Sequence, residues 1–276
     1  MRTSIHKLKW GLFNLIEGDF IGQYARTYGE WSEVEVQFFL SRLSETDNVI
    51  EVGSNIGMHA VPIAQKISQG KLFCFEPQRV IFQNLCCNLS LNQLTNVYTY
   101  NEGVGAQENY IEIATSNYET AWNYGSFSLD KGFNTEGEFG GVIDKQVIRV
   151  NSLDRHPEIQ KLNSLALLKI DAEGFELNVL DGAKETIGRH KPIIFLEAHP
   201  DKAAGLVNYL SELDYRCYWF ISDRYQPNNY FRQEKSISGL DFNLACFPRT
   251  SEDGLADELR ADSHFSLENI PLVTYS

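Results

Sequence analysis

Short apolar runs alternate with longer amphipathic stretches through the middle of this chain. The apolar runs predict strands at residues 49–52, 71–75, 96–100, 165–170 and 192–197. Between them, apolar positions recur at helical spacing and predict helices at 57–68, 78–92, 174–189 and 201–213. Because this alternation is typical of a parallel sheet with helices on both faces, we predict an α/β fold with a Rossmann-like sheet.

The two ends of the chain break this alternation. Residues 215–221 and 244–248 have no clear helix between them. They predict an antiparallel pair at one edge of the sheet, so that the sheet is mostly parallel with an antiparallel last strand. Residues 1–48 predict a helical extension in which Ser32 is an N-cap. The apolar face of the helix after this cap consists of Val36, Phe39, Leu40 and Leu43.

These patterns divide the chain into a helical extension (1–48), one α/β domain (49–249) and a C-terminal tail (250–276). Within the domain, residues 106–150 are rich in glycine and contain two strand-like pieces. We expect this segment to form a hairpin or lid inserted beside the ligand site.

The charge of the chain limits its partners. The formal net charge of -13 repels nucleic-acid phosphates. No apolar run has the length of a membrane span, and no signal-peptide core follows the basic residues at the start. Five cysteines without a C-x-x-C spacing fit a reducing compartment. We therefore expect a cytoplasmic protein with no nucleic-acid partner and no membrane span.

A glycine turn follows the first predicted strand of the domain. Glu51 lies in that strand, Gly53 and Gly57 lie in the turn, and Glu76 ends the next strand. Glycines let the backbone approach a ligand closely, and a carboxylate at the second strand end accepts hydrogen bonds from ribose hydroxyls. The pattern therefore predicts a site for a nucleoside cofactor.

The turn does not suit a dinucleotide. In the pattern G-x-G-x-x-G, Asn55 and Met58 occupy the second and third glycine positions, which disfavours a nicotinamide-dependent oxidoreductase. Glu51 favours a cationic ligand such as S-adenosylmethionine, although it could instead pair with a helix N-terminus. Asn101 or Glu102, at the third strand end, is expected near the adenine. The other residues expected around the cofactor are Tyr28, Ser54, Asn55, Met58, His59, Pro77 and Asp171.

Several motifs together resemble the FkbM family of S-adenosylmethionine-dependent methyltransferases. They are Tyr28-Gly29-Glu30-Trp31, Glu51-Val52-Gly53-Ser54-Asn55-Ile56-Gly57, Phe75-Glu76-Pro77, Lys169-Ile170-Asp171-Ala172-Glu173-Gly174-Phe175-Glu176, Val179-Leu180-Asp181-Gly182-Ala183 and Glu197-Ala198-His199. The resemblance covers about residues 20 to 249 and implies a class I methyltransferase sheet and O-methylation, often of sugars. His59 stands where the family frequently has tyrosine.

Two neighbouring strand ends carry the candidate catalytic groups. Asp171 and Glu173 follow one strand, and Glu197 and His199 follow the next. Methyl transfer needs an acceptor oxygen aligned behind the sulfonium methyl and help with loss of its proton. We expect Asp171 at the methyl group and His199 as general base. Asp171 could also be the N-cap of the following helix, and both roles could hold, while His199 could be a loop residue that caps the helix beginning near Asp201.

The glycine-rich segment carries Trp122, Asn123, Tyr124 and Ser126, a combination of aromatic, amide and hydroxyl groups that suits a sugar. These residues could also form a hydrophobic lid without specificity. We assign no metal ligand, because no spacing requires one. A divalent ion on Asp171, Glu197 and His199 is the less favoured alternative.

The sequence thus predicts an S-adenosylmethionine-dependent O-methyltransferase acting on a carbohydrate, a glycan or a hydroxylated small metabolite. Two alternatives remain open. One is a catalytically silent S-adenosylmethionine-binding module in a glycan assembly complex, and the other is a metal-assisted O-methyltransferase of a non-sugar metabolite.

Overall fold

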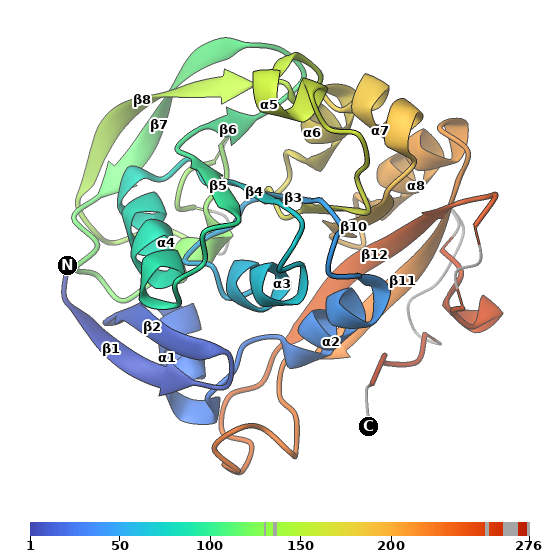
Figure 1. Cartoon of the computed structure of the whole chain (residues 1–276). Coiled ribbons are helices and arrows are strands. Elements are labelled where there is room, and N and C mark those ends of the chain that lie inside the picture. Colours follow the sequence, from blue (N-terminus) through green and yellow to red (C-terminus); the bar gives the residue numbers. More distant parts are fainter. Residues whose placement is uncertain (130, 135–136, 252–253, 262–269, 275–276) are drawn as a thin grey trace.

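The centre of the molecule is a seven-stranded sheet in the order β11-β12-β10-β9-β3-β4-β5 (Figure 1). The computed structural model describes all residues except 130, 135–136, 252–253, 262–269 and 275–276. The five parallel strands are β3 (Val49–Val52), β4 (Leu72–Phe75), β5 (Val97–Tyr100), β9 (Leu167–Ile170) and β10 (Ile193–Glu197). All five predicted parallel strands are therefore confirmed.

The edge of this sheet is antiparallel, as the sequence predicts. Strand β12 (Leu240–Pro248) lies between β10 and β11 (Tyr215–Asp223) and runs antiparallel to both. Two consecutive strands can pair in this way without a crossover helix. The predicted α/β class and the antiparallel last strand are both confirmed.

Helices cover both faces of the sheet (Figure 1). One face carries α2 (Glu33–Arg42), α3 (Ala60–Lys66) and α4 (Arg79–Leu91). The other carries α5 (Pro157–Gln160), α6 (Glu176–Asp181), α7 (Lys184–His190) and α8 (Ala203–Glu212). Successive strand residues point to opposite faces, so Val49 packs in one hydrophobic cluster and Ile50 in the other. Burial on both faces explains why these strands are continuously apolar.

One predicted helix is wrong in its length. Residues 174–189 form two helices, α6 and α7, instead of one. They are separated at Gly182, where an added Cβ would lie 2.0 Å from the carbonyl oxygen of Gly105. The break lets the chain pass close to the strand opposite, which helical spacing alone does not reveal.

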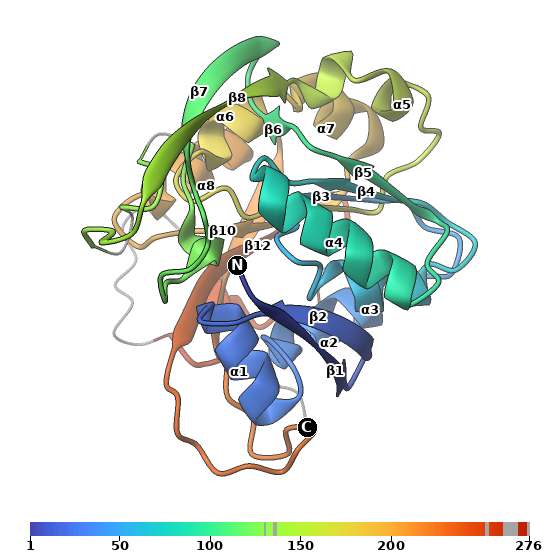
Figure 2. The same ribbon diagram turned by 90° about the vertical axis from the view of Figure 1, so that its left-hand side faces the viewer.

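The first 48 residues are also not all helical. Strands β1 (Thr3–Leu8) and β2 (Gly11–Ile16) form an antiparallel hairpin before α1 (Phe20–Tyr28) and α2. The hairpin packs against α4 (Figure 2), where the Asn14 amide donates to Asn88 Oδ1 at 2.6 Å. Polar contacts to a distant helix stabilise strands whose own alternation is weak. The boundary between an N-terminal extension and the α/β domain at residue 49 stays a prediction.

The glycine-rich segment forms the predicted hairpin. Strands β7 (Asn109–Ser116) and β8 (Ile143–Asn151) are antiparallel, and β6 (Gly103–Val104) joins β8 to complete a three-stranded sheet. A short 3₁₀ helix, η1 (Tyr124–Ser126), lies in the connection. A second one, η2 (Leu153–Arg155), follows β8.

Described parts of the tail lie along β11. The tail contains the 3₁₀ helix η3 (Asp257–Leu259). The amides of Ala261 and Val273 donate to the carbonyls of Cys217 and Ile221. Much of the tail predicted at 250–276 lies outside the described residues. Of the helices in the described ranges, none is long and apolar enough to cross a membrane.

The contact of the hairpin with α4 is testable at Asn88, which is fully buried and also donates to the Ile56 carbonyl at 2.8 Å. Asn88→Ala leaves that carbonyl and the Asn14 amide without their partner. We expect it to lower the free energy of unfolding by about 1–3 kcal/mol in urea denaturation. Exposed Asn109→Ala is the control and should change it by less than about 0.5 kcal/mol. Equal effects of the two variants would contradict this packing.

Candidate active site

A cavity of about 460 Å³ opens at the carboxyl ends of β3, β4, β9 and β10. The residues that follow these strands line it, together with parts of α1, α2 and the insert. Parallel sheets bind ligands at this edge, because the loops after the strands diverge there. The cavity therefore lies where the glycine turn and the strand-end carboxylates were expected.

The turn after β3 is shaped by close contacts of main chain. Gly53 has φ +77°, and an added Cβ there would lie 1.8 Å from the carbonyl oxygen of Asp171. Its amide and that of Ser54 both donate to the carbonyl of Phe75 in β4. Asn55 takes a left-handed conformation with φ +46°. Only a residue without a side chain fits at Gly53, as the sequence predicts.

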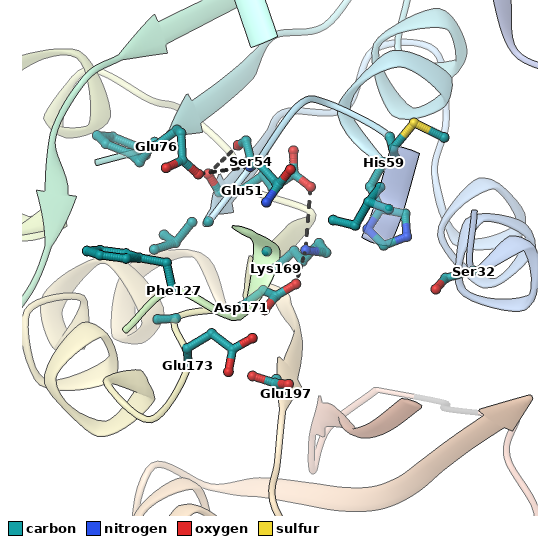
Figure 3. Close-up of a pocket in the computed structure, with 18 of the residues that line it drawn as sticks. Ser32, Glu51, Ser54, His59, Glu76, Phe127, Lys169, Asp171, Glu173 and Glu197 are labelled. Carbon is teal, nitrogen blue, oxygen red and sulfur yellow. Dashed lines mark hydrogen bonds and ion pairs between the residues drawn. The ribbon is translucent and has the colours of Figure 1, made fainter. Parts of the chain in front are cut away.

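Glu76 is buried at the end of β4, with 3% of its surface exposed. Its Oε2 accepts the amide of Asn55 at 3.0 Å, and its Oε1 accepts the amide of Gln78 at 2.8 Å. Burial raises the pKa of Glu76 to about 8, although these two amides oppose the shift. The carboxylate lines the cavity and also holds the turn in place (Figure 3).

A buried lysine lies below the turn. Lys169 Nζ is 3.5 Å from Glu51 Oε1 and 3.3 Å from Asp171 Oδ2. Burial opposes its charge, but Asp171, Glu51 and Glu35 more than compensate and raise the pKa of Lys169. Burial raises the pKa of Glu51, and Lys169 opposes that shift. The lysine thus joins the two carboxylates.

Three carboxylates converge beside it. One oxygen each of Asp171, Glu173 and Glu197 lies within 4.8 Å of the others, and Figure 3 shows the three side chains side by side. Burial, followed by the charges of Glu173 and Asp171, raises the pKa of Glu197 well above its usual value. Oxygen ligands at this spacing could hold a divalent cation. The sequence predicts these three carboxylates at neighbouring strand ends, but its metal alternative has His199 in the place of Glu173.

His199 lies at the rim of the same cavity. Its side chain is 71% exposed, and its Nδ1 is 3.9 Å from Asp201 Oδ1. It is therefore open to water and not enclosed with the carboxylates.

The opposite wall comes from α1, α2, β12 and the loop after β11. Asn243 Nδ2 donates to Glu35 Oε1 at 3.0 Å, and Glu35 Oε2 lies 3.7 Å from His59 Nε2. Burial raises the pKa of Glu35 well above its usual value and lowers that of His59. Except for His59, this wall was not predicted from the sequence. A glutamate on the buried face of an amphipathic helix, as at Glu35, is the signal that could have found it.

Ser32 and Asp241 continue this wall. Ser32 is at the N-cap position of α2, but its hydroxyl caps no helix amide. It donates to Asp241 Oδ2 at 2.7 Å, and Arg224 Nε binds the other oxygen of that carboxylate. The cap predicted from sequence is therefore correct in position and wrong in role. Trp31 lines the cavity next to Ser32.

Most predicted residues lie in this cavity. Those that line it are Glu51, Gly53, Ser54, Asn55, Met58, His59, Glu76, Pro77, Glu102, Asn123, Asp171, Glu173, Glu197 and His199. Gly57 lies in the turn with φ +88° but does not reach the cavity. Glu102 lines it while accepting Arg149 Nη1 at 3.2 Å.

Two predicted cofactor residues have structural roles instead. Tyr28 is fully buried, and its hydroxyl oxygen accepts the amides of Ser236 and Ile237 at 2.8 Å. It packs the N-terminal helix and does not reach the cavity. Asn101 Nδ2 donates to the carbonyls of Glu76 and Pro77, so it holds the turn after β4 without lining the cavity.

The expected sugar-binding aromatics are also placed differently. Tyr124 is fully buried against Tyr118 and Phe133, and its hydroxyl donates to the carbonyl of Thr120. Trp122 packs edge-on against Phe139, and Ser126 is buried. None of Trp122, Tyr124 and Ser126 lines the cavity, because their side chains form the core of the insert. Phe127 lines it instead.

Comparison with known proteins agrees with this geometry. A model of the methyltransferase FkbM domain matches residues 51–217, more than half of the chain. Methyltransferase sdnD of Sordaria araneosa is 29% identical over 202 residues, which cover 62% of this chain and 76% of that protein. Methyltransferase 1 of Beauveria bassiana (strain ARSEF 2860) is 24% identical over 142 residues, covering 49% of this chain and 57% of that one.

Among solved structures, methyltransferase FkbM from Methylobacillus flagellatus KT aligns with a TM-score of 0.47 at 19% identity. The alignment covers 75% of this chain but only 44% of that one. TYW2 of M. jannaschii, solved with AdoMet, aligns with a TM-score of 0.45 at 12% identity, covering 90% and 86%.

The sheet order, the cavity at its carboxyl edge and the family match together define a Rossmann-like methyltransferase. The chain belongs to the FkbM methyltransferase family. It is accordingly an S-adenosylmethionine-dependent methyltransferase, and the predicted family is confirmed.

The close contact at Gly53 is testable by stability. In Gly53→Ala, the new Cβ meets the Asp171 carbonyl and the left-handed backbone is strained. We expect a loss of more than about 2 kcal/mol in the free energy of unfolding, measured in urea. Gly140→Ala is the control, because nothing lies within 4 Å of its added Cβ and its φ is not positive. A Gly53→Ala variant as stable as the control would refute the contact.

Proposed function

We propose that this cavity binds S-adenosylmethionine with its ribose on Glu76, and that the protein transfers the methyl group to a hydroxyl of an acceptor. The observation that supports this proposal most directly is the buried carboxylate of Glu76. It lines the cavity from the end of β4, beside the glycine turn after β3. Each Glu76 oxygen accepts one backbone amide and keeps a further lone pair for a ribose hydroxyl.

The charges around the turn suggest where the other groups of the cofactor would lie. Glu51 and Asp171, which Lys169 joins, both line the cavity, so their negative charge favours the sulfonium and the ammonium group. Glu102 and Phe127, on the Glu76 side, favour the adenine there. The opposite wall of the cavity, which includes His59, would then contact the amino-acid end of the cofactor or the acceptor.

The acceptor end is the region of Asp171, Glu173, Glu197 and His199. In-line methyl transfer requires the acceptor oxygen to be held behind the methyl group. Asp171 follows β9 beside the turn, where the methyl group would lie, and the two glutamates line the adjacent space. Exposed His199 can accept the hydroxyl proton and pass it to water.

A polyhydroxylated acceptor, such as a carbohydrate or a hydroxylated metabolite, fits the polar wall of this end. Carboxylates, the Asn243 amide and the Trp31 ring offer both hydrogen-bonding groups and an apolar surface. This arrangement replaces the aromatic residues of the insert as the proposed acceptor contacts.

A second candidate is metal-assisted O-methylation. The specific observation is the convergence of Asp171, Glu173 and Glu197 within 4.8 Å. A divalent cation on these oxygens would polarise an acceptor hydroxyl and lower its pKa, so that no separate base would be needed.

Cofactor binding should depend on pH through Glu76. Its raised pKa of about 8 means that the ligand-free carboxyl holds a proton at neutral pH. A ligand that needs the ionised form must displace this proton. Affinity for S-adenosylhomocysteine should therefore rise by up to about tenfold per unit from pH 6 to 8 and level off above.

Titration calorimetry in buffers of different ionisation enthalpy measures both the affinity and the released proton. Glu76→Gln should bind more weakly at pH 9 and lose most of the pH dependence. Exposed Glu112→Gln should behave as the wild type. A wild-type affinity that is independent of pH, with no proton released, would contradict the role of Glu76, and absence of binding at millimolar ligand would refute the cofactor site.

Acceptor and mechanism can be tested together by measuring S-adenosylhomocysteine formation over a panel of sugars and hydroxylated metabolites. With an acceptor in hand, His199→Ala should lower kcat by about 10²–10⁴ and leave the affinity for S-adenosylhomocysteine unchanged. His6→Ala on the N-terminal hairpin is the control. Loss of activity in EDTA, restored by Mg²⁺ or Mn²⁺, with His199→Ala fully active, would establish the metal-assisted candidate instead.

A further inference from the structure

One contact joins the N-terminal helix to the insert. Asp19 is the N-cap of α1 and is 2% exposed. Its Oδ2 accepts the amide of Gly22 at 2.9 Å, as a cap does, but its Oδ1 accepts the amide of Tyr124 in the insert at 3.2 Å. One carboxylate therefore serves two segments that are 105 positions apart in the sequence.

Main-chain bonds extend this contact into a short bridge. The amide of Trp122 donates to the carbonyl of Gly18 at 3.1 Å, and the amide of Phe20 donates to the carbonyl of Trp122 at 3.2 Å. Segment 122–127 is thus held along the start of α1 through its backbone, independently of its own side chains.

The same segment is also held from the cofactor side. Gln78 Nε2 donates to the carbonyl of Tyr124 at 3.1 Å, and Gln78 Oε1 accepts the Tyr118 hydroxyl at 3.3 Å. The amide of Gln78 in turn donates to Glu76 Oε1. The two polar groups of the Tyr124 main chain are therefore bound on opposite sides, one by Asp19 and one by the residue that holds Glu76.

Segment 122–127 forms part of the cavity wall. Asn123, Gly125 and Phe127 line the cavity, whereas Asp19 does not. Gly125 fits closely between its neighbours: an added Cβ would lie 2.8 Å from Ile21 Cδ1 and 3.3 Å from Asn55 Nδ2. A small displacement of this segment would therefore change the shape of the cavity beside the glycine turn.

We propose that Asp19 is a positioning residue for cofactor binding, which acts by fixing segment 122–127 across the cavity. This rests on the proposed binding of S-adenosylmethionine in the same cavity. Asp19 lies outside the residues that the family domain matches, so a segment before that domain holds part of the cavity wall in place. Burial raises the pKa of Asp19 to about 6, which shows that keeping this carboxylate enclosed has a cost.

If Asp19 were only a helix cap, its loss would lower stability without affecting cofactor binding. Asp154 is the matched control for this case. Its carboxylate also accepts two backbone amides, those of Glu185 and Thr186, both at 2.8 Å. Asp154 does not line the cavity. Asp19→Ala and Asp154→Ala should both lower the melting temperature, but only Asp19→Ala should weaken S-adenosylhomocysteine binding, by about tenfold.

Asp19→Asn separates the cap from the bridge. It has an NH2 group in place of one of the two acceptor oxygens, so the amide of either Gly22 or Tyr124 loses its acceptor. We expect both the stability and the affinity of this variant to lie between those of the wild type and Asp19→Ala. In hydrogen exchange, amides in 122–127 should exchange faster in both Asp19 variants than in Asp154→Ala.

Asp19 variants that are folded and bind S-adenosylhomocysteine as tightly as Asp154→Ala, or that leave exchange in 122–127 unchanged, would overturn the proposal. If Asp19→Ala fails to fold, Asp19→Asn still decides the question by both measurements. A wild-type protein that does not bind S-adenosylhomocysteine would instead refute the proposed function, so the two failures are distinguishable.

Discussion

The hydrogen bonds of the buried Glu76 carboxylate are the constraint on which the site depends. They fix the amides of Asn55 and Gln78, and through them the glycine turn after β3 and the segment that leads to α4. An enclosed carboxyl with a pKa near 8 is kept against a burial cost of several kcal/mol. The packing of the sheet and helices around Glu76 offsets that cost.

Charge is distributed unevenly in the cavity. Among the described residues that line it, eight carry a carboxyl group, while Lys169 and Arg224 are the permanent cations. Lys169 contacts Glu51 and Asp171, and Arg224 contacts Asp241. The remaining negative potential favours a cationic ligand and fits a sulfonium donor better than a diphosphate. Burial, followed by the charges of neighbouring carboxylates, raises the pKa of both Glu35 and Glu197.

The parts of the fold that the sequence predicts are those decided by local pattern. Parallel strands buried on both faces are continuously apolar, so β3, β4 and β10 were found to within a residue. The hairpin β1–β2 was missed because it alternates weakly and depends on α4, which comes much later in the chain. The break between α6 and α7 arises from a close approach to Gly105, which periodicity does not record.

The residues of the site also fall into those that local sequence predicts and those that it does not. Groups at or directly after the ends of parallel strands, such as Glu76, Asp171 and Glu197, were predictable because the topology brings strand ends together. The wall around Ser32 and Asp241 was not, since these residues are 209 positions apart. Residue type alone also gave a wrong prediction for Tyr124. An aromatic hydroxyl side chain suits a sugar, but this ring packs against Tyr118 in the core of the insert.

The most direct test of this account is the crystal structure of the protein with S-adenosylhomocysteine. The ribose hydroxyls should lie within hydrogen-bond distance of the Glu76 carboxylate, with the sulfur next to Asp171. A ligand bound elsewhere, or a ribose that makes no contact with Glu76, would contradict it.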